Sequence, residues 1–229
     1  VCNLGSINLV QHITEDGQID YKKLESTVSL AVRMLDNVID INYYPTDKAR
    51  EANLAHRPIG LGVMGFQDAL YKLGYAYGSN HAIRIASEFQ EAIACYAIKA
   101  SALLAAEKGR YSSYASSLWD RGILPQDSDE TLMEERHLDY VRSNLPEKDF
   151  WKETRALVAE HGMRNSNVMA IAPTATISNI CGVSQSIEPT FQNLYVKSNL
   201  SGEFTVVNPY LVKALKYEGL WSKEMVQQL

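Results

Sequence analysis

Short apolar segments alternate along this chain with long helical patterns, and this alternation constrains the fold more than any other feature. Between Tyr21 and Asn42, apolar residues recur at steps of three and four, which is the period of an amphipathic helix. A second, alanine-rich helix is predicted from Asn80 to Lys108, and Gly109 is placed to end it. Strands alternating with helices predict an α/β protein, with helices outside a parallel-rich sheet or barrel.

Three apolar runs separate the helical patterns, and each has the composition of a short strand. They are "CNLGSINL" at residues 2–9, "RPIGLGVMGF" at 57–66 and "NVMAIA" at 167–172. Further helices are predicted over residues 66–74, 148–161, 209–217 and 222–229, whereas 110–148 is punctuated by Ser, Asp, Gly and Pro and shows no regular period. No repeat, low-complexity tract or linker divides the chain, so residues 1–229 are predicted to form a single segment.

Composition excludes several classes of function. The 229 residues are 46% hydrophobic and 21% charged, the balance of a globular protein with a buried core. A net charge of −5 argues against a nucleic-acid binder that relies on a basic surface. No apolar run reaches the roughly 18 residues that span a bilayer, and the first residues lack the features of a signal peptide. We therefore expect a cytoplasmic protein without a nucleic-acid or membrane partner.

The chain has three cysteines, Cys2, Cys95 and Cys181, a sparse and odd set that favours a reducing compartment. Their spacing matches no zinc pattern and the five histidines form no HxxxH pair, so no metal site is predicted. Cys95 lies on the apolar side of the long predicted helix and is expected in the core, and packing is also the favoured role for Cys181. Two interpretations of Cys2 stay open: it is an inert buried thiol, or it is a thiol placed to exchange with another.

Gly60, Gly62 and Gly65 have the spacing GxGxxG between a predicted strand and a predicted helix. In dinucleotide-binding folds, this spacing lets the backbone approach a pyrophosphate. However, the first suitable acidic residue, Glu88, lies inside the long predicted helix and not at the end of a second strand, so the βαβ unit is missing. A tight strand-to-helix turn with close packing is favoured, and a nucleotide-binding module without redox chemistry is kept as an alternative.

The stretch "PTATIS" follows the third predicted strand and presents hydroxyl groups at Thr174, Thr176 and Ser178. Successive main-chain N–H groups in such a turn can bind an anion, and a helix beginning there would favour a phosphate. Pro173 suits a first helical turn because it has no N–H to leave unsatisfied. Hydroxyl residues after a strand are equally common as simple helix caps, so both roles stay open. Just upstream, Arg164 is expected to pair with a buried carboxylate or to cap a helix.

Five stretches, taken together, resemble the large, catalytic subunit of ribonucleotide reductase. They are "VCNLGSINL", "RPIGLGVMGFQDAL", "HGMRNSNVMAIAPTATISNI", "QSIEPTFQNLYVKSNLSGEF" and "GLWSKEM", and they occur in the family's order across nearly the whole chain. The likeness is strongest to the class I enzymes, which work with a radical-generating small subunit that holds two metal ions. Class II enzymes, which use adenosylcobalamin, share "GLGVMGF" and a similar loop, and they are the alternative.

The resemblance implies a fold and a reaction. The fold is a barrel of ten strands in two five-stranded halves with helices outside, of which this chain covers mostly the second half. The reaction replaces the ribose 2′-hydroxyl of a ribonucleoside diphosphate by hydrogen, and it supplies deoxyribonucleotides for DNA synthesis. In the family, a cysteine thiyl radical takes the 3′ hydrogen, and two further cysteines are oxidised to a disulfide that thioredoxin or glutaredoxin reduces again.

The resemblance also assigns roles to residues of this chain. Cys2 matches one of the two reducing cysteines, whose partner lies upstream. The "PTATIS" loop matches the family's substrate-diphosphate loop. Ile177 departs from members that carry a hydroxyl residue there, so it can offer only its main-chain N–H. The residues expected to line the phosphates are Thr174, Ala175, Thr176 and Ile177, with Ser178 adjacent.

Much of the family's machinery is expected to lie outside this chain. It has no initiator Met and begins within a predicted strand, so we expect a fragment truncated at both ends. The resemblance places the thiyl cysteine just upstream and the allosteric ATP and deoxynucleotide sites mainly in the missing N-terminal regions. The fragment is therefore expected to be inactive alone and to bind no cofactor. The intact large subunit is expected to form a homodimer.

Overall fold

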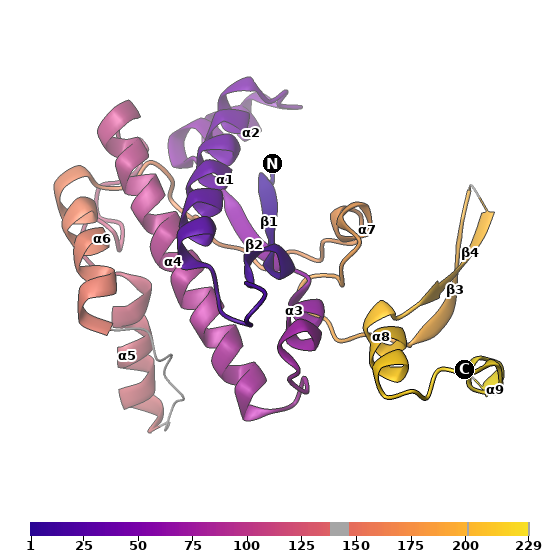
Figure 1. The fold of residues 1–229 in the computed structure, drawn as a ribbon. Helices are drawn as coiled ribbons and strands as arrows, with labels where there is room; N and C mark the ends of the chain where they lie inside the picture. Colours follow the sequence, from indigo (N-terminus) through magenta and orange to yellow (C-terminus); the bar gives the residue numbers. More distant parts are fainter. Residues whose placement is uncertain (138–146, 201, 229) are drawn as a thin grey trace.

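The computed structural model describes residues 1–137, 147–200 and 202–228 (Figure 1). Long helices lie together on one side of two short parallel strands, and a β-hairpin with two short helices extends from the other side. The elements are β1 Leu4–Asn8, a 3-10 turn Leu9–His12, α1 Tyr21–Ile41, α2 Asp47–His56, β2 Gly60–Met64, α3 Phe66–Leu73, α4 Asn80–Lys108, α5 Pro125–Arg136, α6 Glu147–His161, α7 Ile177–Cys181, β3 Leu194–Asn199, β4 Gly202–Val207, α8 Pro209–Tyr217 and α9 Lys223–Gln228.

Strands β1 and β2 pair in parallel, in register from Leu4 opposite Gly60 to Asn8 opposite Met64. The predicted strand at residues 167–172 joins them through a single parallel bridge between Leu61 and Met169. It is thus shorter than the sequence predicted. Within the residues described, the strands form no closed barrel.

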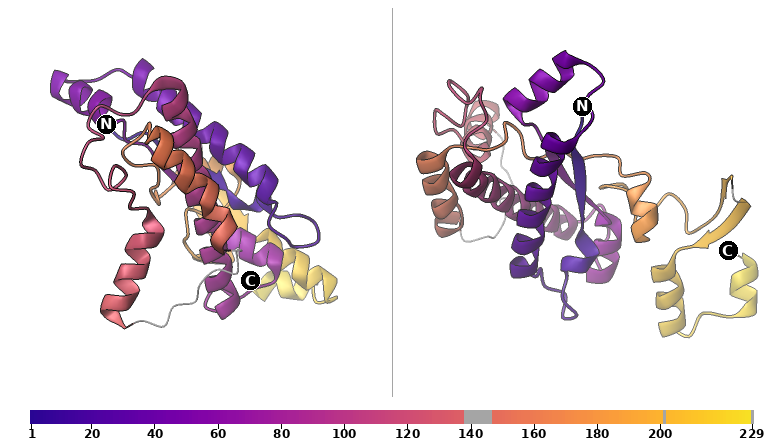
Figure 2. Two further views of the ribbon diagram at one scale, coloured as in Figure 1. Left: turned by 90° about the vertical axis from the view of Figure 1, so that its left-hand side faces the viewer. Right: turned by 90° about the horizontal axis from the view of Figure 1, so that it is seen from above.

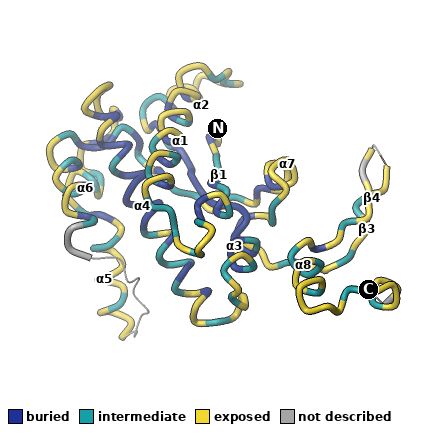
Figure 3. Tube along the Cα trace, in the orientation of Figure 1, coloured by how far each residue is buried: buried dark blue, intermediate teal, exposed yellow. Residues whose placement is uncertain are grey.

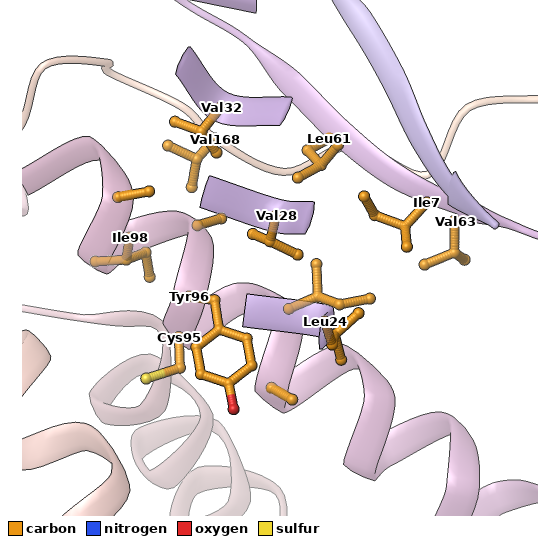
Figure 4. Close-up of a cluster of buried hydrophobic side chains, with 14 of the residues drawn as sticks. Ile7, Leu24, Val28, Val32, Leu61, Val63, Cys95, Tyr96, Ile98 and Val168 are labelled. Atoms are coloured by element: carbon orange, nitrogen blue, oxygen red, sulfur yellow. The ribbon is translucent and has the colours of Figure 1, made fainter. Parts of the chain in front are cut away.

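Helices α1 and α4 cover one face of these strands. Figure 4 shows side chains of α1 directed toward side chains of β1 and β2, and in Figure 2 (right) α1, α4 and α6 gather on one side of the strands. Because side chains alternate along a strand, Leu4 and Ser6 of β1 and Gly60 and Gly62 of β2 belong to the opposite face. The buried side chains drawn on the helical side include Ile7, Leu24, Val28, Val32, Leu61, Val63 and Ile98.

Helices α1, α3, α4, α6 and α8 confirm the predicted helices to within one residue at each end, and Gly74 and Gly109 end α3 and α4. Helices α2 and α5 were not predicted. Helix α2 is capped by Thr46, whose Oγ1 accepts the N–H of Ala49 at 3.2 Å, and α5 begins with Pro125 in its first turn. Residues 138–146, which belong to the irregular stretch 110–148, lie outside the described residues.

The C-terminal part carries the hairpin β3–β4, antiparallel from Leu194 opposite Val207 to Asn199 opposite Gly202. Strand β4 already begins at Gly202, within the turn predicted at "LSGEF" (residues 200–204), so the last three residues of that prediction are strand. Figure 3 shows that the buried residues concentrate in α1, α4 and β2, whereas most of the hairpin is exposed. The core of the chain is therefore the packing of α1 and α4 on β1 and β2.

The glycines of β2 have a packing role. A Cβ added at Gly62 would lie 2.2 Å from the carbonyl oxygen of Ala170, and one at Gly60 would lie 2.8 Å from the Cβ of Ala170. Gly62 therefore lets β2 approach the main chain at Ala170, and Gly60 makes room for the side chains of Leu4 and Ala170. Packing thus accounts for two glycines of GxGxxG without a bound dinucleotide.

We expect Gly62→Ala to destabilise the fold by about 1–3 kcal/mol, because the neighbouring main chain must shift to admit a methyl group. The measurement is the denaturant midpoint of the full-length protein. Gly78→Ala is the matched control, since nothing lies within 4 Å of a Cβ there. Equal midpoints for the two variants would contradict the packing role of Gly62.

Candidate functional site

The "PTATIS" loop lies at the carboxyl end of the third sheet segment, where the chain turns before α7. Thr174 has a φ of 55°, in the left-handed region, although it is a β-branched residue. Such a conformation costs on the order of 1–3 kcal/mol and persists only where surrounding contacts hold it. Ala175, Thr176 and Ile177 follow on the exposed side of the turn.

The hydroxyl of Thr174 already has a protein partner. Its Oγ1 accepts the N–H of Ser186 at 2.8 Å, and the residue is only 8% exposed. A threonine hydroxyl that accepts one hydrogen bond still has a proton to donate. Thr174 therefore combines a structural contact with a remaining donor, whereas Thr176 is exposed and its hydroxyl has no partner among the described residues.

Three consecutive main-chain donors are available at the turn. Among the described residues, the N–H groups of Ala175, Thr176 and Ile177 donate to no protein acceptor, while the N–H of Ser178 closes the turn on Thr174 O at 3.0 Å. Unsatisfied N–H groups that point outward from one turn are the arrangement that binds an anion. The side chain of Ile177 is apolar and 39% exposed, so at this position only the N–H can serve as a donor.

Ser178 lies on the inner side of the same turn. Its side chain is fully buried, and its Oγ has no hydrogen-bond partner in the part of the chain described. Ser178 therefore does not share the exposed side of the turn with Thr176. A buried hydroxyl without a partner is costly, which makes Ser178 the least satisfied group of the loop.

Cys2 is exposed and not part of a disulfide. It precedes β1, and the N–H of Gly60 donates to the carbonyl of the next residue, Asn3, at 2.9 Å, so the ladder extends to this point. Alternation along the strand assigns Cys2 to the same face as Leu4, opposite the helices. The interpretation of Cys2 as a buried residue is thus wrong, because the thiol is open to solvent. Its exchange with another thiol stays a prediction.

The structure does not bring Cys2 and the loop together. Cys2 lies at the amino-terminal edge of the parallel strands, whereas Thr174 is linked through Ser186 to Phe66, just beyond the carboxyl end of β2. The separation along the strands is that of the five-residue β1, about 16 Å at roughly 3.3 Å per residue. The two candidate groups thus lie at opposite ends of the parallel strands.

The other two cysteines differ from each other. Cys95 is buried in α4, as predicted, and its Sγ lies 3.2 Å from Thr154 Oγ1. Burial raises the pKa of the Cys95 thiol to about 11, which keeps it protonated and unreactive at neutral pH. Cys181 ends α7 and is exposed, so the expectation that it packs in the interior is wrong. Cys181 is the last residue of the five-residue helix α7, which buries only Ser178, so the thiol stays at the surface.

A cluster of buried charges lies at the amino-terminal edge of the strands. Asp36 of α1 is fully buried and accepts from Arg57 Nε at 2.9 Å, Arg164 Nε at 3.3 Å and Asn165 Nδ2 at 3.0 Å. Arg57 also binds both oxygens of Asp40, and this pairing lowers the pKa of the Asp40 carboxyl. The predicted ion pair of Arg164 is confirmed. Asp36 was missed, because a single Asp in an amphipathic pattern gives no local signal.

Residues 184–186 are a second set that the sequence did not reveal. The carbonyl of Ser184 accepts the N–H of Gly65 at 2.9 Å, and its N–H donates to Asp68 Oδ2 at 2.6 Å. These contacts tie the loop to the first turn of α3. The one available signal was Asp68 itself, an acidic residue in a first helical turn.

The sequence model of the family described as "Ribonucleotide reductase, barrel domain" matches residues 1–229, the whole chain. The chain belongs to this family. Helices on one face of parallel strands, as in α1 and α4 on β1 and β2, suit the wall of such a barrel.

Curated relatives carry the names of ribonucleotide reductase subunits. The chain is 59% identical over 229 residues to "Ribonucleoside-diphosphate reductase subunit alpha" of Chlamydia muridarum (strain MoPn / Nigg). It is 38% identical to the "Ribonucleoside-diphosphate reductase large subunit" of Danio rerio and to the "Ribonucleoside-diphosphate reductase large chain" of Schizosaccharomyces pombe (strain 972 / ATCC 24843). Each match covers 100% of this chain, but only 22% of the chlamydial protein and 27% of the other two.

Two features are absent from the described residues. No helix there has the length and apolar character needed to cross a membrane. No group of three or more His, Cys, Asp or Glu side chains in that part is arranged to hold a metal ion.

Proposed function

We propose that this chain is part of the large subunit of a ribonucleoside-diphosphate reductase, which reduces ribonucleoside diphosphates to deoxyribonucleoside diphosphates. The observation that carries the proposal is the family match over all 229 residues, together with the names of relatives up to 59% identical. In this proposal, residues 1–229 are one segment of a ten-stranded barrel that the rest of the subunit completes. The single helix-covered face of β1 and β2 supports that placement.

The substrate diphosphate binds at the loop of residues 174–177. Support comes from the three main-chain N–H groups without protein acceptors, and from the exposed hydroxyl of Thr176 beside them. These neutral donors suit phosphate oxygens, and each hydrogen bond to a charged oxygen is stronger than one between neutral groups. Ile177 contributes its N–H, which compensates for the missing hydroxyl. Ser178 supports the turn from its buried side.

Cys2 supplies part of the reducing power. Replacing a 2′-hydroxyl by hydrogen releases water and consumes two electrons and two protons, which two thiols provide as they form a disulfide. Cys2 is one of these thiols, and its partner belongs to the rest of the subunit. The exposed, unpaired state of Cys2 on the helix-free side of β1 supports this role.

The proposal includes the partners of the complete enzyme. The names "subunit alpha" and "large subunit" describe relatives that work with another subunit, so we assign a radical-generating small subunit to this protein as well. Thioredoxin or glutaredoxin reduces the disulfide, the large subunit forms a homodimer, and the enzyme works in the cytoplasm. The segment alone is inactive and binds no cofactor, and allosteric ATP and deoxynucleotide sites belong to other parts of the subunit.

Thr176→Val in the full-length enzyme tests the substrate site. The change keeps the shape of an exposed side chain and removes one donor to a charged phosphate, so substrate binding should weaken by about 1.5–3 kcal/mol. Equilibrium binding of a ribonucleoside diphosphate measures the effect. Thr205→Val, the same change at an exposed threonine of β4, is the control. An unaltered dissociation constant for Thr176→Val would remove the loop from the substrate site.

A further inference from the structure

The loop proposed to bind the diphosphate and the residues that contact it at 184–186 each contain one residue in a rarely adopted backbone conformation. Thr174 and Ser186 both have positive φ angles, 55° and 46°, and both are buried. A residue with a Cβ stays in this region only where its surroundings hold it there. The hydrogen bond from Ser186 N–H to Thr174 Oγ1 at 2.8 Å joins the two. The shape of the turn therefore depends on what holds residues 184–186.

The first turn of α3 holds these residues. The N–H of Gly65 donates to Ser184 O at 2.9 Å, and the N–H of Phe66 donates to Ser186 O at 3.4 Å. The N–H of Ser184 in turn donates to Asp68 Oδ2 at 2.6 Å. Of these contacts, the one with Asp68 is the shortest and the only one made by a charged side chain, so it is the strongest of the set.

The position of Asp68 within α3 shows how one oxygen of its carboxylate serves the loop. Gly65 is the N-cap, so Asp68 is the third residue of the helix. An acidic residue at this position commonly accepts from the N–H of its own N-cap residue. Here the N–H of Gly65 donates to Ser184 O instead, and Asp68 accepts from the N–H of Ser184. The exchange joins the helix start to the loop and leaves neither group unsatisfied.

We propose that Asp68 is a positioning residue for the diphosphate loop. Its carboxylate fixes Ser184, residues 184–186 fix Thr174, and Thr174 sets the direction of the N–H groups of residues 175–177. This inference rests on the proposed function of that loop. It adds a residue of α3, 116 positions away from Ser184 in the sequence, to the determinants of substrate affinity.

A role of Asp68 through α8 is the competing explanation. Tyr210 of α8 stacks on Tyr71 of α3 with ring centroids 5.2 Å apart. Burial, and then the nearby charge of Asp68, raise the pKa of Tyr210 to about 12, so the phenol and the carboxylate lie close together. Tyr210→Phe separates the two roles, because it removes the phenolic hydroxyl and keeps the stacked ring.

The test compares steady-state kinetics of full-length variants assayed with the small subunit. We expect Asp68→Ala to raise the KM for a ribonucleoside diphosphate roughly tenfold with kcat little changed. The phosphate contacts are the same in the ground and transition states, so their loss acts on KM. Asp68→Asn keeps an acceptor oxygen and is expected to restore a KM within about twofold of the parent value. Tyr210→Phe is expected to leave KM unchanged.

Three results would overturn the inference: an unchanged KM in Asp68→Ala, no rescue by Asp68→Asn, or the same rise in Tyr210→Phe. If Asp68→Ala fails to fold, as judged by its melting temperature, Ser184→Pro removes the donor of the same hydrogen bond and should give the same rise. Thr176→Val separates this inference from the proposed function. A rise in KM there with none in Asp68→Ala overturns only the positioning role, whereas no rise in Thr176→Val overturns the substrate site itself.

Discussion

Cys2→Ser in the full-length enzyme is expected to reduce thioredoxin-dependent turnover to below about one thousandth of the parent rate, a loss of roughly 4 kcal/mol in transition-state stabilisation. The physical reason is that a serine hydroxyl cannot form a disulfide. The pair of thiols is then incomplete and cannot supply the two electrons that reduce the ribose. Because Cys2 is exposed and precedes β1, the replacement leaves the packing of the strands intact. The measurement is deoxyribonucleotide formation with small subunit, thioredoxin and its reductase present.

Cys181→Ser is the matched control for this experiment. Cys181 is also exposed and not part of a disulfide, but it lies at the end of α7, beyond the opposite edge of the strands. Its replacement should leave turnover at the parent level. Melting temperatures of both variants should equal that of the parent enzyme. Steady-state turnover that survives in Cys2→Ser would remove Cys2 from the reducing pair.

The parts of the fold that the sequence predicted are those stabilised by an apolar face or bounded by glycine. Helix α1 buries Leu24, Val28 and Val32 at helical spacing, and α4 ends at Gly109, so both were predictable from local pattern. Helix α2 buries only Asn53, and α5 buries no residue. Such helices are stabilised by their caps and give no apolar period, so a search for periodicity overlooks them.

The candidate site also has features that the local sequence predicts and contacts that it does not. The position of "PTATIS" after an apolar segment is local information, and it predicts a turn there. Whether its hydroxyl and N–H groups bind an anion or cap a helix stayed open at that point. The contact of Asp68 with Ser184 joins distant parts of the chain, and no spacing rule encodes it. Cys2 has an exposed thiol, but so has Cys181, and geometry alone does not separate them. The family resemblance made that distinction.

The buried cluster around Asp36 provides the largest expected effect on stability. Asp36→Ala in the full-length subunit should lower the free energy of unfolding by about 3–5 kcal/mol, because Arg57 and Arg164 would lose the buried carboxylate that they share. Asp36 also accepts from Asn165, which precedes the third sheet segment, as Arg57 precedes β2. One carboxylate of α1 thus fixes the starts of two neighbouring strands. Chemical denaturation compared with the parent protein measures the loss.

Arg33→Ala is the control that isolates burial as the cause. Arg33 lies on the same helix and pairs with Glu107 through two hydrogen bonds of 2.9 and 2.6 Å, a geometry as good as that of the Asp36 cluster. Its side chain, however, is 44% exposed, whereas Asp36 is fully buried. Solvent replaces the lost contact of an exposed pair, so its removal should shift the denaturation midpoint far less. Equal shifts for the two variants would show that the charges around Asp36 are reached by water when the carboxylate is removed, and that the cluster does not fix the strand starts.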